Sequence, residues 1–396
     1  MAPINLDHNA TTPLLPEAAE AMHAAALAYP GNPASQHELG RQARRVLEEC
    51  RTRIGELLGA RTGGMAADRV VFTSGGTEAN NLALRGLLPA VPRGSAKSAA
   101  TDGPPRVDLA VSAIEHPSVA AAATELEAAG RSVVLLPVDA EGVLRLDALA
   151  EQLAGGVRLV SVMLANNETG VLQPVVEAAS QCRLHGAVIH TDAVQAVGKI
   201  PVDFAELGVD AMTVAAHKFH GPQGIGVLVV RAGVPLTPLM AGGFQQAGLR
   251  PGTESVALAV GMQTALEAWQ RETEDRTRRL ASIGRELQTA LRGEFPDAVV
   301  VGGAAPRLPH TLCIAFAGVD RQQLAMALDL AGVACSTGSA CASGSSEPSP
   351  VLLAMGLPED VISGAIRLSW GAGTTAAEMA EATRRISLCV KQLQRR

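Results

Sequence analysis

Aromatic side chains are scarce in this chain of 396 residues, since Phe, Trp and Tyr together make up 2% of it. Proteins that bind single-stranded nucleic acid stack bases on such rings, so the scarcity argues against that class of protein. The net charge of -6, with both signs scattered along the chain, also provides no basic face for a phosphate backbone. We therefore expect no direct nucleic-acid partner, and a core of aliphatic side chains and alanine.

Long apolar runs are also missing, since no stretch approaches the roughly 18 apolar residues that span a bilayer. The first residues, MAPINLDHNATTP, do not combine a basic start with the apolar run of a secretory leader. We expect a soluble, cytoplasmic protein without a membrane partner.

Clustered metal ligands are absent as well. The six cysteines lie far apart, form no CxxC pair and have no group of histidines beside them: Cys50, Cys182, Cys313, Cys335, Cys341 and Cys389. Such spacing in a long chain without an export signal predicts reduced thiols and no metal site.

Short β-branched runs are what the sequence does contain. Seven of them alternate with helical patterns, at residues 69–74, 107–113, 132–138, 157–164, 187–193, 210–216 and 226–231. These strands are too apolar to have a solvated face, so the alternation predicts an α/β fold with a mostly parallel sheet covered on both sides. Apolar residues at spacings of three and four predict an amphipathic helix over 40–59.

The C-terminal part of the chain has a different pattern. A long charged helix is predicted over 255–293, followed by strands at 311–317 and 366–370 and a final amphipathic helix. We expect an N-terminal arm, 1–14, that packs on the smaller domain, a large domain over 15–260, and a smaller α+β domain over 261–396. The Pro-, Gly- and Ser-rich stretch 91–107 is interpreted as a surface loop and has no assigned role.

The stretch VAAHKFHGPQGIG, residues 214–226, places Lys218 at the end of an apolar strand, on a turn made tight by glycine and proline. Lysine forms Schiff bases with carbonyl compounds, and the aldehyde of pyridoxal phosphate is the commonest such cofactor. The stretch therefore suggests a pyridoxal phosphate enzyme. A solvated loop lysine is the alternative interpretation.

Other polar residues also follow predicted strands. The turn TSGGTEANN opens a helix at Gly76 and Thr77, whose N–H groups would suit a phosphate, although such glycines often serve only tight packing. Asp192 in HTDAVQ could pair with a pyridinium nitrogen or cap a helix. His116 in IEHPS could stack on a planar cofactor or be an ordinary core or loop residue. Asn167 in NNETG could hydrogen-bond a cofactor hydroxyl or a substrate, or form a turn. Ligands of open α/β sheets bind where strands end, which is where all of these residues lie.

Two further residues of interest lie near the C-terminus. Cys341 belongs to the Gly- and Ser-rich stretch ACSTGSACASGSSEPSP, a polar setting that suits a reactive thiolate or simply an inert surface thiol. Arg367 lies inside the apolar strand AIRLSWG and needs an anionic partner. That partner is either a structural carboxylate or the carboxylate of a bound amino acid.

Taken together, these stretches resemble the cysteine desulfurases of the class V aminotransferase superfamily, over essentially the whole chain. The resemblance rests on ordered motifs: DHNATTP, NPASQH, TSGGTEANN, IEHPS, NNETG, HTDAVQ, HKFHGPQGIG, GLRPGT, STGSAC, EPSPVLLAMG and AIRLSWG. It implies a pyridoxal phosphate-dependent transferase of fold type I, with a seven-stranded, mostly parallel sheet in the large domain and the catalytic cysteine in the small one.

The resemblance also implies a role for each matching residue. Lys218 would form the Schiff base and Cys341 would be the nucleophile that accepts sulfur. His116 would stack on the cofactor ring, Asp192 would pair with its nitrogen and Gln195 would face its phenolic oxygen. The remaining roles are phosphate binding by Gly76, Thr77 and His217, phosphate binding across a homodimer by Thr253, and substrate carboxylate binding by Asn167 and Arg367.

The implied reaction converts L-cysteine to L-alanine and leaves a persulfide on Cys341, which passes to an acceptor such as an iron–sulfur scaffold protein. Two alternatives remain open. One is a selenocysteine lyase or another class V pyridoxal phosphate enzyme. The other is a non-catalytic protein of the same fold that binds a sulfur-transfer partner.

One position departs from the family pattern. The family commonly has a serine two residues before the His–Lys pair, where it contributes to the phosphate cup, whereas this chain has Ala215 followed by Ala216. One charge-assisted hydrogen bond of about 1.5–3 kcal/mol is then missing. We expect this departure to affect how tightly the cofactor is bound and not the type of reaction.

Overall fold

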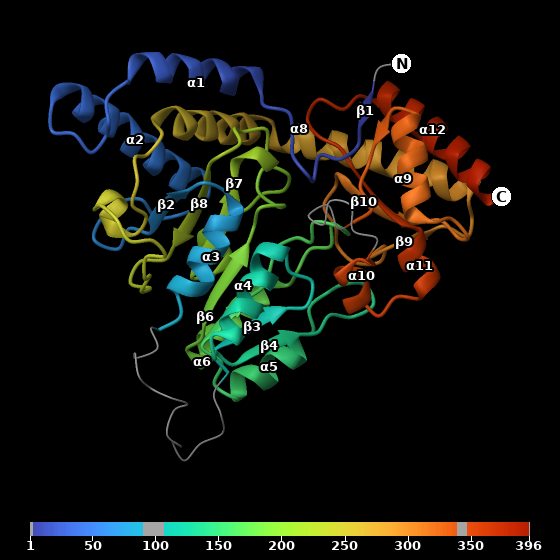
Figure 1. The fold of residues 1–396 in the computed structure, drawn as a ribbon, viewed down its shortest axis with the longest axis horizontal. Coiled ribbons are helices and arrows are strands. Elements are labelled where there is room, and N and C mark those ends of the chain that lie inside the picture. Colours follow the sequence, from blue (N-terminus) through green and yellow to red (C-terminus); the bar gives the residue numbers. More distant parts are fainter. Residues whose placement is uncertain (1–2, 90–106, 339–346, 396) are drawn as a thin grey trace.

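The computed structural model describes residues 3–89, 107–338 and 347–395 (Figure 1). Most of the expected loop 91–107 and the predicted nucleophile Cys341 therefore lie outside the described residues.

A seven-stranded sheet forms the centre of the larger part of the molecule. Its strand order is β2-β8-β7-β6-β5-β3-β4, and all neighbours are parallel except that β8 runs antiparallel to both β2 and β7. The strands are β2 (Arg69–Thr73), β3 (Leu109–Ser112), β4 (Val133–Leu136), β5 (Leu159–Ser161), β6 (Val188–Asp192), β7 (Ala211–Ala215) and β8 (Gly226–Val230). Each strand lies within one of the seven predicted runs, so the mostly parallel α/β sheet is confirmed.

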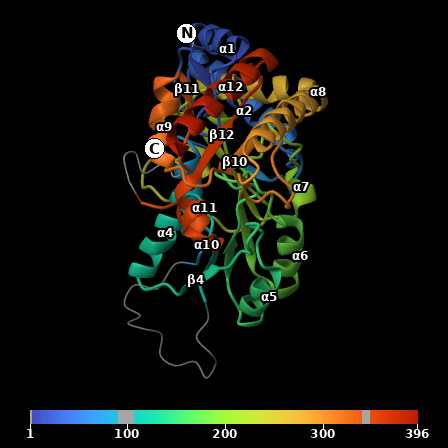
Figure 2. The ribbon, with the colours of Figure 1, turned by 90° about the vertical axis from the view of Figure 1, so that its right-hand side faces the viewer.

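Helices cover both faces of this sheet, as the edge-on view shows (Figure 2). One face packs on α3 (Gly76–Gly86) and α4 (Pro117–Ala128) through an aliphatic cluster that includes Leu82 and Val119. The other face packs on α2, α5 and α6 through a larger cluster. The bounds on this side are α2 (Glu38–Leu57), α5 (Leu146–Ala154), α6 (Val175–His185) and the short α7 (Phe204–Leu207). Since both faces are buried, the strands are apolar throughout, as parallel sheets require.

The C-terminal part has its own small sheet, in which β10 lies between β12 and β9 and is antiparallel to both. Its elements are β9 (Val299–Val300), β10 (Thr311–Ala315), α9 (Arg321–Leu330), β11 (Val333–Ala334), α10 (Pro350–Ala354), α11 (Glu359–Gly364), β12 (Ala365–Ser369) and α12 (Ala376–Gln394). A capping box between Thr375 and Glu378 begins α12. The N-terminal strand β1 (Ile4–Asn5) pairs with β11 and buries Leu6 in this second core.

The long helix α8 (Val256–Glu294) runs between the two parts (Figure 1). Its first half contributes Ala259 and Met262 to the core of the large sheet, and its second half contributes Leu280 and Leu287 to the core of the small one. Helix α1 (Pro16–Ala28) packs along α8. The division into 1–14, 15–260 and 261–396 stays a prediction, and we propose it as the domain organisation because the two cores meet along this helix.

Across the described ranges, every helix falls short of the length and hydrophobicity that crossing a membrane requires.

Candidate functional site

The predicted cofactor residues gather where the central strands of the large sheet end. Strand β6 ends at Asp192, and β7 ends at Ala215 and continues into a short 3-10 helix, η1 (Ala216–Lys218). Helix α3 begins at Gly76, directly after β2. Because parallel neighbours end at the same edge, residues distant in sequence are brought together there.

Lys218 points its amine at the N-terminal arm. Its Nζ donates hydrogen bonds to the carbonyl oxygens of Asn9, at 2.6 Å, and Ala10, at 2.8 Å. The Asn9 carbonyl also accepts a bond from Nε2 of Gln195 at 3.0 Å. The arm therefore joins Lys218 and Gln195, two of the predicted cofactor residues.

Asp192 connects to His116 through two buried polar side chains. Asn80 Nδ2 donates to Oδ2 of Asp192 at 2.6 Å and to Oγ of Ser118 at 2.8 Å. The Ser118 hydroxyl lies 2.7 Å from Nδ1 of His116, which also caps α4. Burial lowers the pKa of His116, the Asp192 carboxylate opposes that shift, and Lys218 adds to it. The imidazole is thus favoured in its neutral form, which suits a ring that stacks on a cofactor. We call His116, Asp192, Gln195 and Lys218 the strand-end cluster.

The turn before α3 forms a close-packed cradle. Gly75 has a φ of 155°, a conformation that favours glycine, and no side chain of the described residues caps the first N–H groups of α3 from the N-cap position. A Cβ on Gly76 would lie 3.1 Å from Val194 Cγ2 and 3.6 Å from the Ala215 Cβ. The position that departs from the family pattern therefore lies directly against the predicted phosphate turn.

The other predicted phosphate residues differ in their exposure. His217 is half-buried, its Nδ1 lies 3.1 Å from Oγ1 of Thr11, and burial together with nearby lysines lowers its pKa to about 4. Thr77 is exposed in the first turn of α3. Thr253 is exposed on the loop between the 3-10 helix η2 (Gln245–Gly248) and α8, so its role toward a second subunit stays a prediction.

Arg367 lies on β12 and is 1% exposed. Its NH2 group donates to Oδ1 of Asp7 at 2.6 Å, and its NH1 group donates to the carbonyl oxygen of Asn167 at 3.0 Å. Its Nε has no hydrogen-bond partner among the described residues. Arg367 and Asn167 thus lie together through the Asn167 backbone, and Asp7 of the arm is a carboxylate partner of Arg367.

Glu168, the neighbour of Asn167, lies against Ser349 and Gly338, which stand on either side of Cys341 in the sequence. Its Oε2 accepts a bond from Oγ of Ser349 at 2.6 Å. The same oxygen lies 2.6 Å from where a Cβ on Gly338 would stand, and Gly338 has a φ of +100°. Burial raises the pKa of Glu168, against the charges of Arg367 and Arg321. We call Glu168, Gly338 and Ser349 the Glu168 anchor.

The five cysteines that the structure describes are free thiols. Burial raises the pKa of Cys50 to about 11 and that of Cys182, Cys313 and Cys335 to about 12. Because the thiolate is the nucleophile, these four are poorly suited to attack sulfur at neutral pH.

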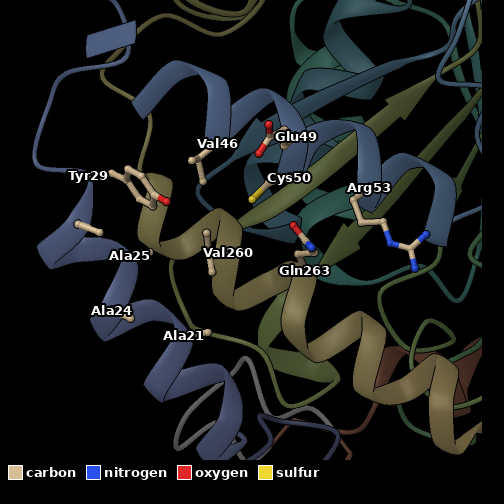
Figure 3. Close-up of a pocket in the computed structure, with 11 residues that line it drawn as sticks. Ala21, Ala24, Ala25, Tyr29, Val46, Glu49, Cys50, Arg53, Val260 and Gln263 are labelled. Carbon is tan, nitrogen blue, oxygen red and sulfur yellow. The ribbon is translucent and has the colours of Figure 1, made fainter. Parts of the chain in front are cut away.

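A separate groove of about 490 Å³ lies between α1, α2 and α8 (Figure 3). Small alanines of α1 form one wall, while Cys50 and Arg53 on α2 and Gln263 on α8 form the others. None of the predicted site residues that the structure describes lines it. We therefore place the functional site at the strand ends and not in this groove.

Comparison with known proteins decides the family. Residues 4–381 match the model of the class-V aminotransferases. A cysteine desulfurase of Cereibacter sphaeroides is 42% identical over 380 residues, which cover 96% of this chain and 93% of that protein. This chain belongs to the cysteine desulfurases of the class-V aminotransferase family.

Solved structures agree with this family. The NifS-like protein of Rickettsia africae has a TM-score of 0.86 and 29% identity, covering 98% of this chain and 99% of its own. The structure of SspA in complex with cysteine has a TM-score of 0.75 and 28% identity, and the match covers 92% of this chain and 98% of the SspA chain. The fold is therefore that of the pyridoxal phosphate enzymes of fold type I, and the cofactor of the family is pyridoxal phosphate.

The residues present fit that cofactor. The cradle at Gly75 and Gly76 offers uncapped N–H groups for a phosphate, Asp192 offers a buried carboxylate, and Lys218 ends the 3-10 helix that follows the neighbouring strand β7. Asn80 Oδ1 is buried without a hydrogen-bond partner in the described part of the chain.

Sequence reasoning assigned no role to several residues that the structure brings into the site. Asn9, Asn80 and Glu168 lie inside the motifs DHNATTP, TSGGTEANN and NNETG, but the contacts that bring them into the site join residues 302, 112 and 181 positions apart. Lys199 had a detectable signal, since it is a lone charge in the apolar stretch that follows HTDAVQ.

Proposed function

We propose that this cysteine desulfurase converts L-cysteine to L-alanine, with Lys218 as the cofactor-binding lysine and base and Cys341 as the sulfur acceptor. One observation carries the proposal, namely that the strand-end cluster brings a lysine, a carboxylate and a neutral imidazole to one sheet edge beside an uncapped helix N-terminus. Pyridoxal phosphate, when bound, supplies an electron sink for carbanion chemistry. These are the groups that hold and tune such a sink.

The residues of this chain divide the remaining work. Asp192 holds a negative charge where the cofactor nitrogen would lie, and His116 presents a ring face. Arg367 and Asn167 orient the carboxylate of cysteine, because a buried guanidinium gives planar, directional recognition. Lys218 takes the proton from the substrate Cα, its amine being positioned by the carbonyl groups of Asn9 and Ala10.

Sulfur transfer is assigned to Cys341. Its thiolate attacks the substrate sulfur, an S–S bond forms as the C–S bond breaks, and the carbon keeps the electron pair and takes up a proton to give L-alanine. The high pKa of Cys182, Cys313 and Cys335 supports this choice, because burial keeps those thiols protonated.

The persulfide then passes to a sulfur-acceptor protein such as an iron–sulfur scaffold. We further propose a homodimer in which the exposed Thr253 reaches the phosphate site of the second subunit. A cytoplasmic location is consistent with the free thiols of the described cysteines.

The test is Cys341→Ala with Cys335→Ala as the matched control, measured on full-length protein loaded with cofactor. We expect Cys341→Ala to lose alanine production and to keep the visible absorption of bound cofactor. Cys335→Ala should keep both. Mass spectrometry of the wild-type protein after cysteine treatment should find one extra sulfur atom on the peptide that contains Cys341. Full activity in Cys341→Ala would overturn the assignment of the nucleophile.

A further inference from the structure

A second lysine lies buried beside the predicted cofactor site. Lys199 is 4% exposed, on the turn that follows β6, and its Nζ donates to Oε1 of Gln195 at 2.9 Å. A buried lysine with an amide as its polar partner is costly, because desolvation penalises the ammonium. Burial lowers the pKa of Lys199 well below its ordinary value, and the charges of Lys218 and Arg367 lower it further.

The contacts of Gln195 allow only one orientation of its amide. Nε2 donates to the Asn9 carbonyl oxygen at 3.0 Å, and that carbonyl has no proton to give. A flipped amide would set its oxygen against this carbonyl oxygen with no proton between the two, and would lose the bond that the Gln195 oxygen accepts from Lys199. Lys199 and Asn9 therefore fix Nε2 as the end of Gln195 that faces the arm and Lys218.

The turn that contains Lys199 packs closely against the loop that contains Lys218. Gly198 has a φ of +78°, and a Cβ there would lie 2.1 Å from the Cβ of Phe219, the residue after Lys218. The Lys199 N–H bonds back to the Ala196 carbonyl at 3.1 Å. Since the Phe219 side chain packs directly on Gly198, the position of Lys199 relative to Lys218 is set by packing.

We propose that Lys199 is a positioning residue, which holds the Gln195 amide with its Nε2 donor toward the phenolic oxygen of the cofactor. This inference rests on the proposed cofactor site. A donor fixed opposite an anionic oxygen favours the deprotonated form of the cofactor, so it lowers the pH at which the visible absorption of the bound cofactor changes. Lys199 acts through Gln195 and touches no reacting atom.

Other titratable groups face the same region, so the variants that test Lys199 must leave these residues unsubstituted. Those in electrostatic contact with Lys199 are Lys218, Arg367, His8, His217, His220 and His310.

The experiment compares wild type with Lys199→Met, both full-length and loaded with cofactor, and follows the visible band as a function of pH. We expect the midpoint to rise by about one pH unit in Lys199→Met, the scale of shift that a lost hydrogen bond or nearby charge produces. Lys199→Arg keeps the donor and should restore part of the shift. An unchanged midpoint in Lys199→Met would overturn the inference.

Two further variants separate positioning from a general effect. In a Gln195→Met background, Lys199→Met should move the midpoint no further, and a shift of the same size there would show that Lys199 does not act through Gln195. Arg385→Met removes a buried cation of α12 and should lower thermal stability without moving the midpoint. If Lys199→Met fails to fold, Lys199→Leu, which likewise has no donor for Gln195, takes its place with the same expected direction.

Different results would overturn the proposed function and the proposed role of Lys199. A wild-type protein with no visible band, or a band that survives in Lys218→Ala, would overturn the cofactor site itself. A normal wild-type band that is lost in Lys218→Ala and unmoved in Lys199→Met would overturn only the role of Lys199.

Discussion

The strand-end cluster and the Glu168 anchor hold functional residues in different ways. In the cluster, Asp192 and Lys218 are placed by the ends of adjacent parallel strands, β6 and β7. In the anchor, the Glu168 carboxylate accepts a hydrogen bond from Ser349 and lies against Gly338, two residues that flank Cys341 in sequence. The first arrangement follows from sheet topology and the second from a single buried carboxylate.

The difference implies separate consequences of mutation. The cluster should control binding and tuning of the cofactor, because it contains Lys218 and because Asp192 is hydrogen-bonded to Asn80 of α3, the helix that begins at the phosphate cradle. The anchor should control the sulfur-transfer step and leave the cofactor unaffected. Variants that change one property and not the other test this division.

The largest effect is expected from Asp192→Asn. Loss of the carboxylate removes a hydrogen bond to a charged group, worth about 1.5–3 kcal/mol, and so should lower kcat/KM by roughly 10- to 100-fold. Asp210→Asn is the matched control, because Asp210 precedes β7 at the opposite end and its carboxylate accepts a bond from the Ile189 N–H at 2.9 Å. The control should lose some stability and little activity. Equal loss of activity in both would contradict the strand-end site.

A smaller effect is expected from Glu168→Ala. This change removes the acceptor for Ser349 beside Gly338, so alanine production should fall by about tenfold, equivalent to roughly 1.4 kcal/mol. Cofactor affinity, measured by fluorescence titration of the unloaded protein, should stay within error of wild type. Weaker cofactor binding in this variant would show that the two regions are not independent.

The same residue predicts a pH dependence of stability. Burial raises the pKa of the Glu168 carboxyl in the folded state. As the pH rises above about 4.3, the ordinary pKa of a glutamate, the carboxyl therefore loses its proton in the unfolded chain before it does so in the folded protein. The free energy of unfolding then falls with increasing pH until the folded pKa is passed. Glu168→Gln has no such proton, and chemical denaturation across this pH range should show a smaller fall than in wild type. If the free energy of unfolding changes with pH equally in wild type and Glu168→Gln, then Glu168 does not contribute to the pH dependence of stability.

The sequence predicts the large sheet well because each strand is a short apolar run and parallel strands bring their ends together. Lys218 and Asp192 could therefore be assigned to one edge before any coordinates were known. The motif resemblance added Gln195 and Thr253, which the local pattern does not single out. The bonds of Asn9 to Thr311 and of Asp7 to Arg367 could not be predicted, because they join residues about 300 or more positions apart and depend on how the arm packs. The orientation of the Gln195 amide likewise follows only from its partners in space.

The smallest effect is expected at the departure from the family pattern. Ala215→Ser restores a hydroxyl beside Gly76, where the Ala215 Cβ lies 3.6 Å from a Cβ built on that glycine. The new donor should tighten cofactor binding by roughly threefold to tenfold, since a charge-assisted bond of about 1.5–3 kcal/mol is partly offset by the cost of burying the hydroxyl. The unloaded variant should be slightly less stable than wild type for the same reason.

Ala216→Ser is the matched control for this change. Ala216 is equally buried, but it packs in the larger hydrophobic cluster, to which Ala215 does not belong, and its Cβ lies 2.9 Å from a Cβ built on Gly221. A hydroxyl there should lower stability and leave cofactor affinity unchanged. If Ala215→Ser weakens binding as much as it destabilises the protein, then no hydroxyl is missing at position 215, and Gly76, Thr77 and His217 hold the phosphate without it.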